Sequence, residues 1–265
     1  MSTEKNGSWD FELSIIIPVK DEEENIAGLA KEVNESMASV DYLWECIWVD
    51  DGSTDGTLSE LEKMNKQDSR HQFVLLSKNY GQSAALYAGF NFAKGRLLST
   101  LDGDGQNDPK DLPALVARLV EGNVDMVNGI RQKRKDSFIR KISSRIGNGF
   151  RNWLTGESIT DVGCSLRVFK HTYAENIPSF KGMHRFLPTL IRIGGGSSII
   201  EIPVNHRPRK YGETKYGIGN RLWVGIMDTL AVRWMQSRMV FANIEYTSSI
   251  QKDKKGNRQQ LIRFG

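Results

Sequence analysis

The sequence has few cysteines and no long hydrophobic run, and both shortages narrow the class of protein. Only Cys46 and Cys164 are present among the 265 residues; they lie far apart, each in an apolar context. Two such residues provide neither a disulfide framework nor metal-ligand spacing, so we expect a protein of a reducing compartment. No stretch approaches the roughly 18 apolar residues of a membrane-spanning helix.

Common targeting and nucleotide-binding signatures are also missing. Residues 1–10 are polar, and the apolar run that follows ends at Val19, which is too short for a secretory signal peptide. No Gly-x-Gly-x-x-Gly motif follows that run, which argues against a Rossmann dinucleotide site. The glycines at 194–196 lack the lysine and serine of a P-loop and are expected to form the turn after a helix. We therefore expect a soluble or peripheral protein.

Charge is distributed unevenly along a chain whose composition is otherwise globular. Hydrophobic residues make up 39% and charged residues 26%, enough apolar residues for a real core. The net charge is only +4, but eight basic residues and one acid lie between Arg131 and Arg151, whereas four consecutive acids occupy 21–24. This asymmetry indicates an anionic partner near the basic segment.

Strands and helices are predicted to alternate through the first half of the chain. The predicted strands cover 13–19, 44–50, 72–77, 96–101 and 124–129, and the predicted helices cover 22–37, 57–65, 82–93 and 109–121. This alternation predicts an α/β fold with a doubly wound, mainly parallel, Rossmann-like sheet. The second half is less regular, with strands expected at 163–169 and 199–204 and helices at 137–154, 184–193 and 218–241.

The loop after the run at 96–101 carries the most specific local signal, Asp102-Gly103-Asp104-Gly105-Gln106. Ligands of open α/β sheets bind beyond the carboxyl ends of the strands. Two carboxylates there suit a divalent cation held against a diphosphate, because Mg²⁺ is commonly bound by one or two carboxylates plus phosphate oxygens. An EF-hand is excluded, since Asn107 and Pro113 stand where it needs glycine and glutamate. Taken alone, the loop could also be a polar turn without a ligand.

Several other predicted strands end in polar residues, among them Asp50, Asp51, Lys78 and Arg131. The carboxyl ends of parallel strands meet at one edge of a sheet, so we expect these side chains and the acidic loop to line one crevice, where a nucleotide would bind. The alternatives are ordinary structural roles. The two aspartates could cap a helix, Lys78 could be a solvated lysine, and the basic run could be a solvated face.

Three segments together resemble family 2 glycosyltransferases with a GT-A fold: 17–25 (IPVKDEEEN), 49–57 (VDDGSTDGT) and the loop at 102–106. Farther along, the segments 78–85, 129–131, 161–167 and 207–217 are similar to those of polyprenyl-phosphate (dolichyl-phosphate mannosyltransferase-like) glycosyltransferases. The resemblance extends from about residue 13 to 217. It implies Mg²⁺ or Mn²⁺ as cofactor, a nucleotide diphosphate sugar as donor and a polyprenyl phosphate lipid as acceptor.

The same resemblance implies roles for residues at matching positions. The donor-binding residues would be Pro18, Glu22, Asp50, Asp51, Lys78, Gln82, Asp102, Arg207 and Thr214. The metal ligands would be Asp102, Asp104 and Gln106, and the acceptor phosphate would lie near Arg131 and Arg145. The catalytic set would comprise Asp104, Asp161, Arg131 and Lys215. Thr214 departs slightly from the family motif, which has serine as often at this position.

Physical chemistry supports this assignment independently of the resemblance. Transfer from a nucleotide diphosphate sugar requires neutralisation of the leaving group, which a metal and nearby cations provide. A phosphate monoester acceptor is already anionic and needs no strong general base, which agrees with a crevice of arginines and no obvious catalytic histidine. Direct attack from the opposite face would invert the anomeric carbon. Asp161 would bind a sugar hydroxyl, or act as base if the acceptor were a hydroxyl.

Four segments are expected: an N-terminal extension at 1–12, a catalytic domain at 13–217, an amphipathic helix at 218–241 and a polar tail at 242–265. Many relatives carry hydrophobic C-terminal spans, which this sequence lacks, yet a polyprenyl acceptor requires access to a bilayer. The 218–241 segment, with two tryptophans and flanking arginines, is the expected interfacial element, holding the protein at the cytoplasmic face of the membrane. Alternatively, a separate membrane protein recruits the enzyme, or this helix packs against the catalytic domain as core.

The leading functional hypothesis is an inverting, metal-dependent transferase that moves a sugar from a UDP- or GDP-sugar to a polyprenyl phosphate. A second hypothesis keeps the donor but uses a hydroxyl of a glycan as acceptor. A third is a non-catalytic nucleotide-sugar-binding subunit of a membrane complex. Nucleic-acid binding would explain the basic run but not the acidic strand ends, so no nucleic-acid partner is expected.

Overall fold

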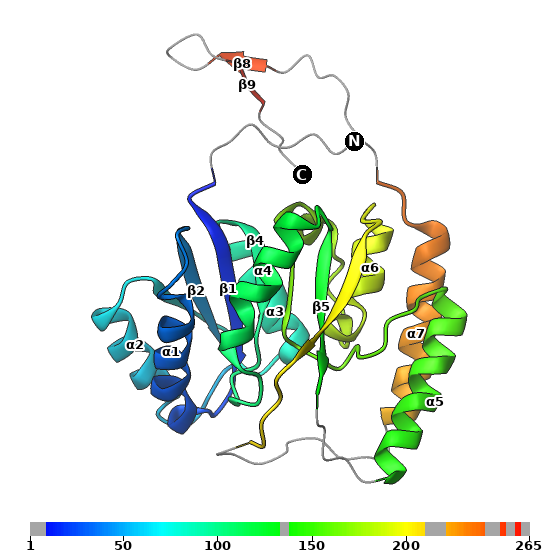
Figure 1. The fold of residues 1–265 in the computed structure, drawn as a ribbon, viewed down its shortest axis with the longest axis horizontal. Helices are drawn as coiled ribbons and strands as arrows, with labels where there is room; N and C mark the ends of the chain where they lie inside the picture. Colours follow the sequence, from blue (N-terminus) through cyan, green and yellow to red (C-terminus); the bar gives the residue numbers. More distant parts are fainter. Residues whose placement is uncertain (1–8, 133–137, 210–220, 242–249, 253–257, 261–265) are drawn as a thin grey trace.

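The computed structural model describes residues 9–132, 138–209, 221–241, 250–252 and 258–260. A seven-stranded sheet with the order β3-β2-β1-β4-β6-β5-β7 forms its centre (Figure 1). The strands are β1 Phe11–Val19, β2 Trp44–Asp50, β3 His71–Leu75, β4 Gly95–Thr100, β5 Met126–Arg131, β6 Arg167–Lys170 and β7 Ile199–Val204. Strand β6 is antiparallel to both β4 and β5, and the other neighbouring strands are parallel. The predicted mainly parallel sheet is thus confirmed.

Helices cover both faces of this sheet, as expected for a doubly wound fold. The α-helices are α1 Glu23–Met37, α2 Thr57–Gln67, α3 Gln82–Phe92, α4 Leu112–Glu121, α5 Phe138–Thr155, α6 Leu187–Ile193 and α7 Arg221–Arg238. One cluster of buried side chains joins α1, α2 and α4 to the sheet, and a second joins α3, α6 and α7 to its other face. A separate antiparallel pair is formed by β8 Ile250–Lys252 and β9 Arg258–Gln260.

Strand β1 illustrates why the central strands are continuously apolar. Successive side chains of a strand point to opposite faces of the sheet. Ile15 and Ile17 accordingly belong to the first buried cluster and Ile16 to the second. Because helices cover both faces, residues 13–17 of the strand are all buried, and the apolar run shows no polar alternation.

The bounds of several expected elements differ from the structure, and two of these differences have clear local reasons. The strand expected at 163–169 is reduced to β6, because the residues before Arg167 form a loop closed by the Cys164 amide donating to the Asp161 carbonyl. The helix expected at 109–121 begins with a 3₁₀ turn, Pro109–Asp111, in which the Asp108 side chain caps the Lys110 amide. Helix α4 starts only after that turn.

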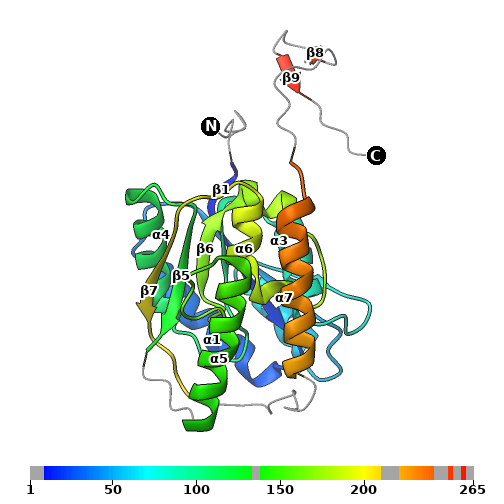
Figure 2. The same ribbon diagram turned by 90° about the vertical axis from the view of Figure 1, so that its right-hand side faces the viewer.

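Helices α5 and α7 lie side by side at one edge of the molecule (Figures 1 and 2). Thr229 and Val232 of α7 are buried, whereas Trp223 and Trp234 are 65% and 62% exposed. The expected helix at 218–241 therefore exists as α7, and it packs on the domain while presenting large apolar side chains outward. Among the described residues, no helix is both long and apolar enough to cross a membrane.

Candidate functional site

The carboxyl ends of β1, β2 and β3 surround a hollow of about 590 Å³. Its lining includes Lys20, Asp50, Ser53, Leu75 and Lys78. The Lys78 ammonium also lies over the Tyr80 ring, 5.2 Å from its centre. Polar side chains make up most of the lining and three leucines the rest, so the hollow can contact both polar and apolar parts of a small molecule.

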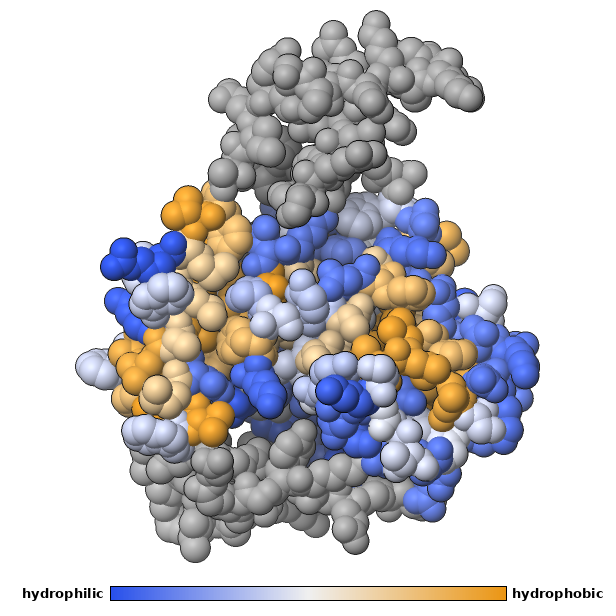
Figure 3. Space-filling model, turned by 180° about the vertical axis from the view of Figure 1, so that it is seen from behind, coloured by the Kyte–Doolittle hydropathy of each residue, from blue (hydrophilic) through white to orange (hydrophobic). Residues whose placement is uncertain are grey.

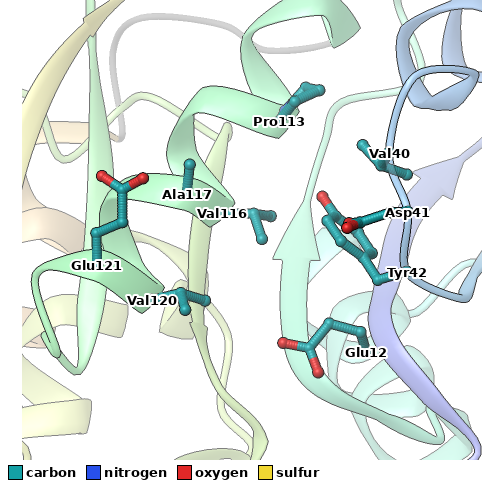
Figure 4. Close-up of a pocket in the computed structure, with 9 residues that line it drawn as sticks. All are labelled: Glu12, Val40, Asp41, Tyr42, Pro113, Val116, Ala117, Val120 and Glu121. Atoms are coloured by element: carbon teal, nitrogen blue, oxygen red, sulfur yellow. The ribbon is translucent and has the colours of Figure 1, made fainter.

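A second hollow, of about 360 Å³, lies at the opposite end of β1, against α4 (Figure 4). Its lining is mainly apolar and includes Val40, Tyr42 and Val116. Burial and then the Glu12 and Asp41 carboxylates raise the pKa of Tyr42 to about 12. Ligands of open α/β sheets bind at the carboxyl ends of the strands, so this hollow is not the candidate site.

The two aspartates that end β2 differ in their surroundings. Asp50 accepts a hydrogen bond from the Ser53 amide at 2.9 Å. Asp51 is buried, and its two oxygens accept the amides of Tyr80 and Gly81, each at 2.7 Å. Asp51 thus ties the end of β2 to the loop that begins α3, which is the role its geometry shows directly.

Gly52 permits this close approach of the two loops. Its φ of +67° lies in the left-handed region, and a Cβ there would come within 2.5 Å of the Lys78 carbonyl carbon. Only glycine avoids both the backbone strain and the collision.

The acidic segment at 21–24 is largely bound to the neighbouring loop. The Asp21 carboxylate accepts the Thr54 amide at 2.8 Å, and Glu23 accepts the Gly56 amide at 2.7 Å. Glu22 accepts the Asn25 side-chain amide at 2.6 Å. Pro18 lies one position before the end of β1, and a Cβ added at Gly103 would come within 3.0 Å of the Pro18 carbonyl oxygen. These contacts hold the entrance of the hollow in place.

Asp102 directly follows β4 and faces the start of α3. The Gln82 side-chain amide donates to its Oδ1 at 2.8 Å, which brings together two predicted donor residues. Burial and then the nearby Asp104 carboxylate raise the pKa of Asp102 above its ordinary value. A nearby cation would favour the ionised form of both carboxylates.

Asp104 is 7% exposed, and protein groups occupy both of its oxygens. Oδ1 accepts the Gln106 amide at 3.0 Å, and Oδ2 accepts Arg209 Nη2 at 2.7 Å. Arg209 was not among the predicted site residues. The predicted Arg207 instead forms a bidentate pair with Glu32 of α1, at 3.2 and 2.6 Å.

Local sequence offers no means of choosing between these two arginines. The segment that carries them pairs with the acidic loop. His206 forms an isolated antiparallel β-bridge with Asn107, and the Arg207 amide donates to the Gln106 carbonyl at 2.7 Å. The Gln106 side-chain amide in turn reaches the Arg207 carbonyl at 3.4 Å. This long-range pairing sets which guanidinium reaches Asp104.

Arg131 and Asp161 were predicted for separate roles, and the structure joins them. Arg131 Nε and Nη2 donate to the two Asp161 oxygens at 2.8 and 2.7 Å, and the Arg131 amide adds a third hydrogen bond at 3.2 Å. The side chains are 13% and 14% exposed. A bidentate pair of this kind fixes the orientation of the guanidinium.

Arg167 is a further cation near the site that the sequence analysis missed. It begins β6, is 2% exposed, and donates to the carbonyls of Val162, Cys164 and His184. Burial lowers its pKa, and the nearby Asp102 and Asp161 carboxylates oppose that effect. An arginine inside an expected strand gives no sequence signal of such a position.

His184 is neutral near pH 7, because burial, followed by the charges of Arg185 and Arg167, lowers its pKa to about 3. Its Nδ1 forms a 2.9 Å hydrogen bond with Ser83 Oγ at the start of α3.

Three predicted site residues cannot be placed in this geometry. Thr214 and Lys215 lie outside the described residues, and Arg145 belongs to α5 but its side chain is outside the described part.

The donor set of the acidic loop fits a hard divalent cation. Asp102, Asp104 and Gln106 offer carboxylate and amide oxygens, which Mg²⁺ and Mn²⁺ prefer. No group of three or more His, Cys, Asp or Glu side chains that could hold a metal occurs in the part of the chain that the structure describes. A cation held by Asp102, Asp104 and Gln106 would need further ligands, such as phosphate oxygens and water.

Solved structures share this architecture. Glucosyl-3-phosphoglycerate synthase from Mycobacterium tuberculosis, in complex with phosphoglyceric acid, matches with a TM-score of 0.63 at 16% identity, over 91% of this chain and 83% of that chain. A structure of that synthase with Mn²⁺ and uridine-diphosphate-glucose matches with a TM-score of 0.61 at 17% identity, over 95% of this chain and 87% of the other. The shared arrangement is the GT-A fold.

The chain belongs to glycosyl transferase family 2, whose sequence profile matches residues 14–178. It is 40% identical over 225 residues to the dodecaprenyl-phosphate galacturonate synthase of Rhizobium johnstonii, covering 84% of this chain and 66% of the relative. It is 39% identical over 207 residues to the undecaprenyl-phosphate 4-deoxy-4-formamido-L-arabinose transferase of Edwardsiella ictaluri, covering 78% and 63%. The chain thus spans less than two thirds of the length of these relatives.

Proposed function

We propose that the protein is an inverting, metal-dependent glycosyltransferase that moves a sugar from a nucleotide diphosphate sugar to a polyprenyl phosphate. The observation that carries the proposal is the position of the acidic loop: it follows β4, which lies in the sheet between β1–β3, whose ends form the hollow, and β5, whose last residue Arg131 pairs with Asp161. Relatives named for transfer to dodecaprenyl and undecaprenyl phosphate support the acceptor. A structure of the same fold with Mn²⁺ and uridine-diphosphate-glucose supports the donor and metal.

On the donor side, the nucleoside would occupy the hollow, with Asp50 and Lys78 among its contacts. The diphosphate would extend toward Asp104, and Asp102 is already oriented by Gln82. A bound Mg²⁺ or Mn²⁺ supplies charge neutralisation for the departing diphosphate. Arg167, which donates to three backbone carbonyls and interacts electrostatically with Asp102, adds a positive charge that needs no reorganisation during the reaction.

On the acceptor side, Arg131 would bind the polyprenyl phosphate. One phosphate oxygen attacks the anomeric carbon, a new carbon–oxygen bond forms, and the bond to the nucleotide diphosphate breaks with its electron pair on the leaving group. Attack from the opposite face inverts the anomeric centre. No proton has to be removed from the acceptor, because the phosphate is already ionised.

The Arg131–Asp161 pair favours this acceptor over a hydroxyl. A hydroxyl acceptor would require Asp161 to accept a proton, but a carboxylate bound bidentately to a guanidinium is a weak base. A phosphate acceptor needs only the oriented cation. In this proposal Asp161 acts through Arg131 as a positioning residue.

The edge formed by α5 and α7 would place the site at a membrane surface. Figure 3 shows apolar surface over this edge, on the left of the view. Its exposed large apolar side chains are Phe150, Trp153, Trp223, Val224, Met227, Leu230 and Trp234. The exposed Arg233 and Arg238 of α7 could meet anionic headgroups beside them. We propose that this edge lies on the cytoplasmic membrane face, alone or with a separate membrane protein.

The test is a transfer assay with a panel of radiolabelled UDP- and GDP-sugars and polyprenyl phosphate, with and without Mn²⁺. We expect metal-dependent label in the lipid fraction, lost in Asp104→Ala. Asp41→Ala is the matched control, because Asp41 is exposed and lies at the opposite end of β2. It should retain full activity.

Two outcomes would redirect the proposal. Label in a glycan without polyprenyl phosphate would establish a hydroxyl acceptor. Donor binding with no transfer to any acceptor would indicate a nucleotide-sugar-binding subunit that serves a membrane partner.

A further inference from the structure

Asp104 is engaged by a cation of the protein itself. Its Oδ2 bonds to Arg209 Nη2 at 2.7 Å, and its Oδ1 to the Gln106 amide at 3.0 Å. The carboxylate is 9% exposed in this pair and the arginine side chain 27%. A metal ion that coordinates Asp104 needs one of these oxygens, and the guanidinium is the partner that carries a competing charge.

The position of Arg209 is set by a series of contacts just before it in the chain. The Asn205 amide donates to the Asp111 carboxylate at 2.7 Å, and His206 forms an antiparallel β-bridge with Asn107. Arg207 holds Glu32 and also donates to the Asn107 carbonyl at 3.0 Å. Because these contacts fix residues 205–207 beside the acidic loop, Arg209, two residues later, lies within reach of Asp104.

The charges that face Arg209 come from more than one element. Hydrogen bonding to Asp104 and the Coulombic attraction of Asp104, Glu22 and Asp102 raise its pKa despite partial burial, which acts in the opposite direction. The guanidinium therefore lies in the negative field that the proposed metal would occupy. Two cations cannot share this field without strong repulsion.

We propose that Arg209 occupies the cation position on Asp104 until a nucleotide diphosphate arrives, so that the site excludes free divalent metal and takes up metal together with the nucleotide. The proposal rests on the proposed function for the metal position at Asp104 and for the identity of the diphosphate ligand. The phosphate oxygens of a diphosphate can accept hydrogen bonds from the displaced Arg209 guanidinium, since arginine recognises phosphate with two parallel hydrogen bonds. Free metal offers it no such partner.

The test is direct Mn²⁺ binding, measured from the free Mn²⁺ signal in electron paramagnetic resonance, without any sugar donor. Arg209→Gln should lower the Kd for Mn²⁺ by about 10-fold, because the variant removes a competing charge and retains hydrogen-bonding capacity. The matched control is Arg192→Gln, which breaks an ion pair with Glu157 (2.9 Å) on the α6 side of the molecule. Its Mn²⁺ affinity should equal that of the wild type.

Addition of saturating UDP or GDP should reduce the difference between wild type and Arg209→Gln to less than about 3-fold, since the diphosphate then binds the released arginine. Equal or weaker Mn²⁺ binding by Arg209→Gln in the absence of nucleotide would overturn the proposal, provided that circular dichroism shows a folded variant. If the difference in Mn²⁺ affinity between wild type and Arg209→Gln persists with nucleotide, the inference that metal binds together with the nucleotide would be overturned. Failure of the proposed function would show separately, as no labelled lipid in the transfer assay.

Discussion

Arg131 and Asp161 lie 30 positions apart in the sequence and form one rigid unit in the fold. Each was predicted as a site residue, but the role of the carboxylate follows from its partner. A carboxylate alone in a crevice could act as a base, whereas one bound through both oxygens to arginine mainly orients and neutralises that cation.

Replacement of Asp161 by Asn should therefore impair acceptor binding more than the chemical step. We expect KM for polyprenyl phosphate to rise about 10-fold or more with a smaller change in kcat, and the free energy of unfolding to fall by about 1–3 kcal/mol, because a largely buried cation loses its charged partner. Steady-state kinetics and urea unfolding measure the two effects. Glu35→Gln, which removes an exposed pair with Lys31, should change stability by less than about 0.5 kcal/mol. Unchanged KM in Asp161→Asn would contradict the positioning role.

His71 should make the fold sensitive to acid. Trp48 Nε1 donates to its Nδ1 at 3.1 Å, and its Nε2 lies 3.0 Å from Asn34 Oδ1, an arrangement that suits the neutral ring. Burial lowers the pKa of His71 to about 4; the Asp68 carboxylate opposes this effect and the Arg70 cation adds to it. Below about pH 6.5 the unfolded chain gains a proton that the folded chain does not, so stability falls as pH decreases toward 4.

The expected loss through His71 between pH 7.5 and 5.0 is about 2 kcal/mol. Urea unfolding at both pH values measures it as the difference between wild type and His71→Gln. The variant should lose less stability on acidification, although His184, also buried with a lowered pKa, continues to contribute. Equal losses in the two proteins would show that His71 does not titrate as described.

At the scale of elements, the apolar patterns predicted which segments form strands and helices, whereas local turns shifted some of their first and last residues. Strands β2 and β7 occupy the predicted residues without change, because each is a short apolar run between polar segments. The helix predicted at 184–193 is interrupted, since Pro188 lies in the first turn of α6 and a separate 3₁₀ turn, Met183–Arg185, precedes it. Such boundaries depend on individual turns, which periodicity does not describe.

Helix α7 allows a test of the proposed membrane surface. Trp223 and Trp234 are mostly exposed, so their joint replacement by serine should leave stability nearly unchanged while lowering affinity for anionic vesicles by about 10-fold or more. Sedimentation with vesicles containing a phosphatidylglycerol fraction measures the binding. Leu43→Ser is the control, because Leu43 is 69% exposed but lies beside the amino end of β2. Equal vesicle binding by wild type and the tryptophan variant would exclude α7 as the contact.

At the scale of the whole molecule, the candidate site gathers segments from Pro18 to Arg209 around the carboxyl edge of the sheet. Ligand binding there should stabilise the entire domain. A nucleotide with Mn²⁺ at 100 times its Kd should add about 2.7 kcal/mol to the free energy of unfolding and raise Tm by roughly 5–10 °C. Thermal unfolding with UDP and with GDP would also reveal which nucleotide is bound.

Two variants serve as controls in this thermal-unfolding experiment. Asp104→Ala should abolish the Mn²⁺-dependent part of the Tm increase, and Asp41→Ala should preserve it. A full increase without metal, or an increase that survives in Asp104→Ala, would argue against metal binding at the acidic loop.

The sequence by itself determined the order of strands and helices, the family, and the location of the acidic loop at the end of β4. These properties depend on the local alternation of apolar and polar residues and on short motifs, which act over a few positions. The tertiary structure decided which side chains meet: Arg209 with Asp104 across 105 positions, Arg207 with Glu32 across 175, and Asp51 with the start of α3. Those pairings depend on loop conformations and on the packing of distant segments, and no local pattern encodes them.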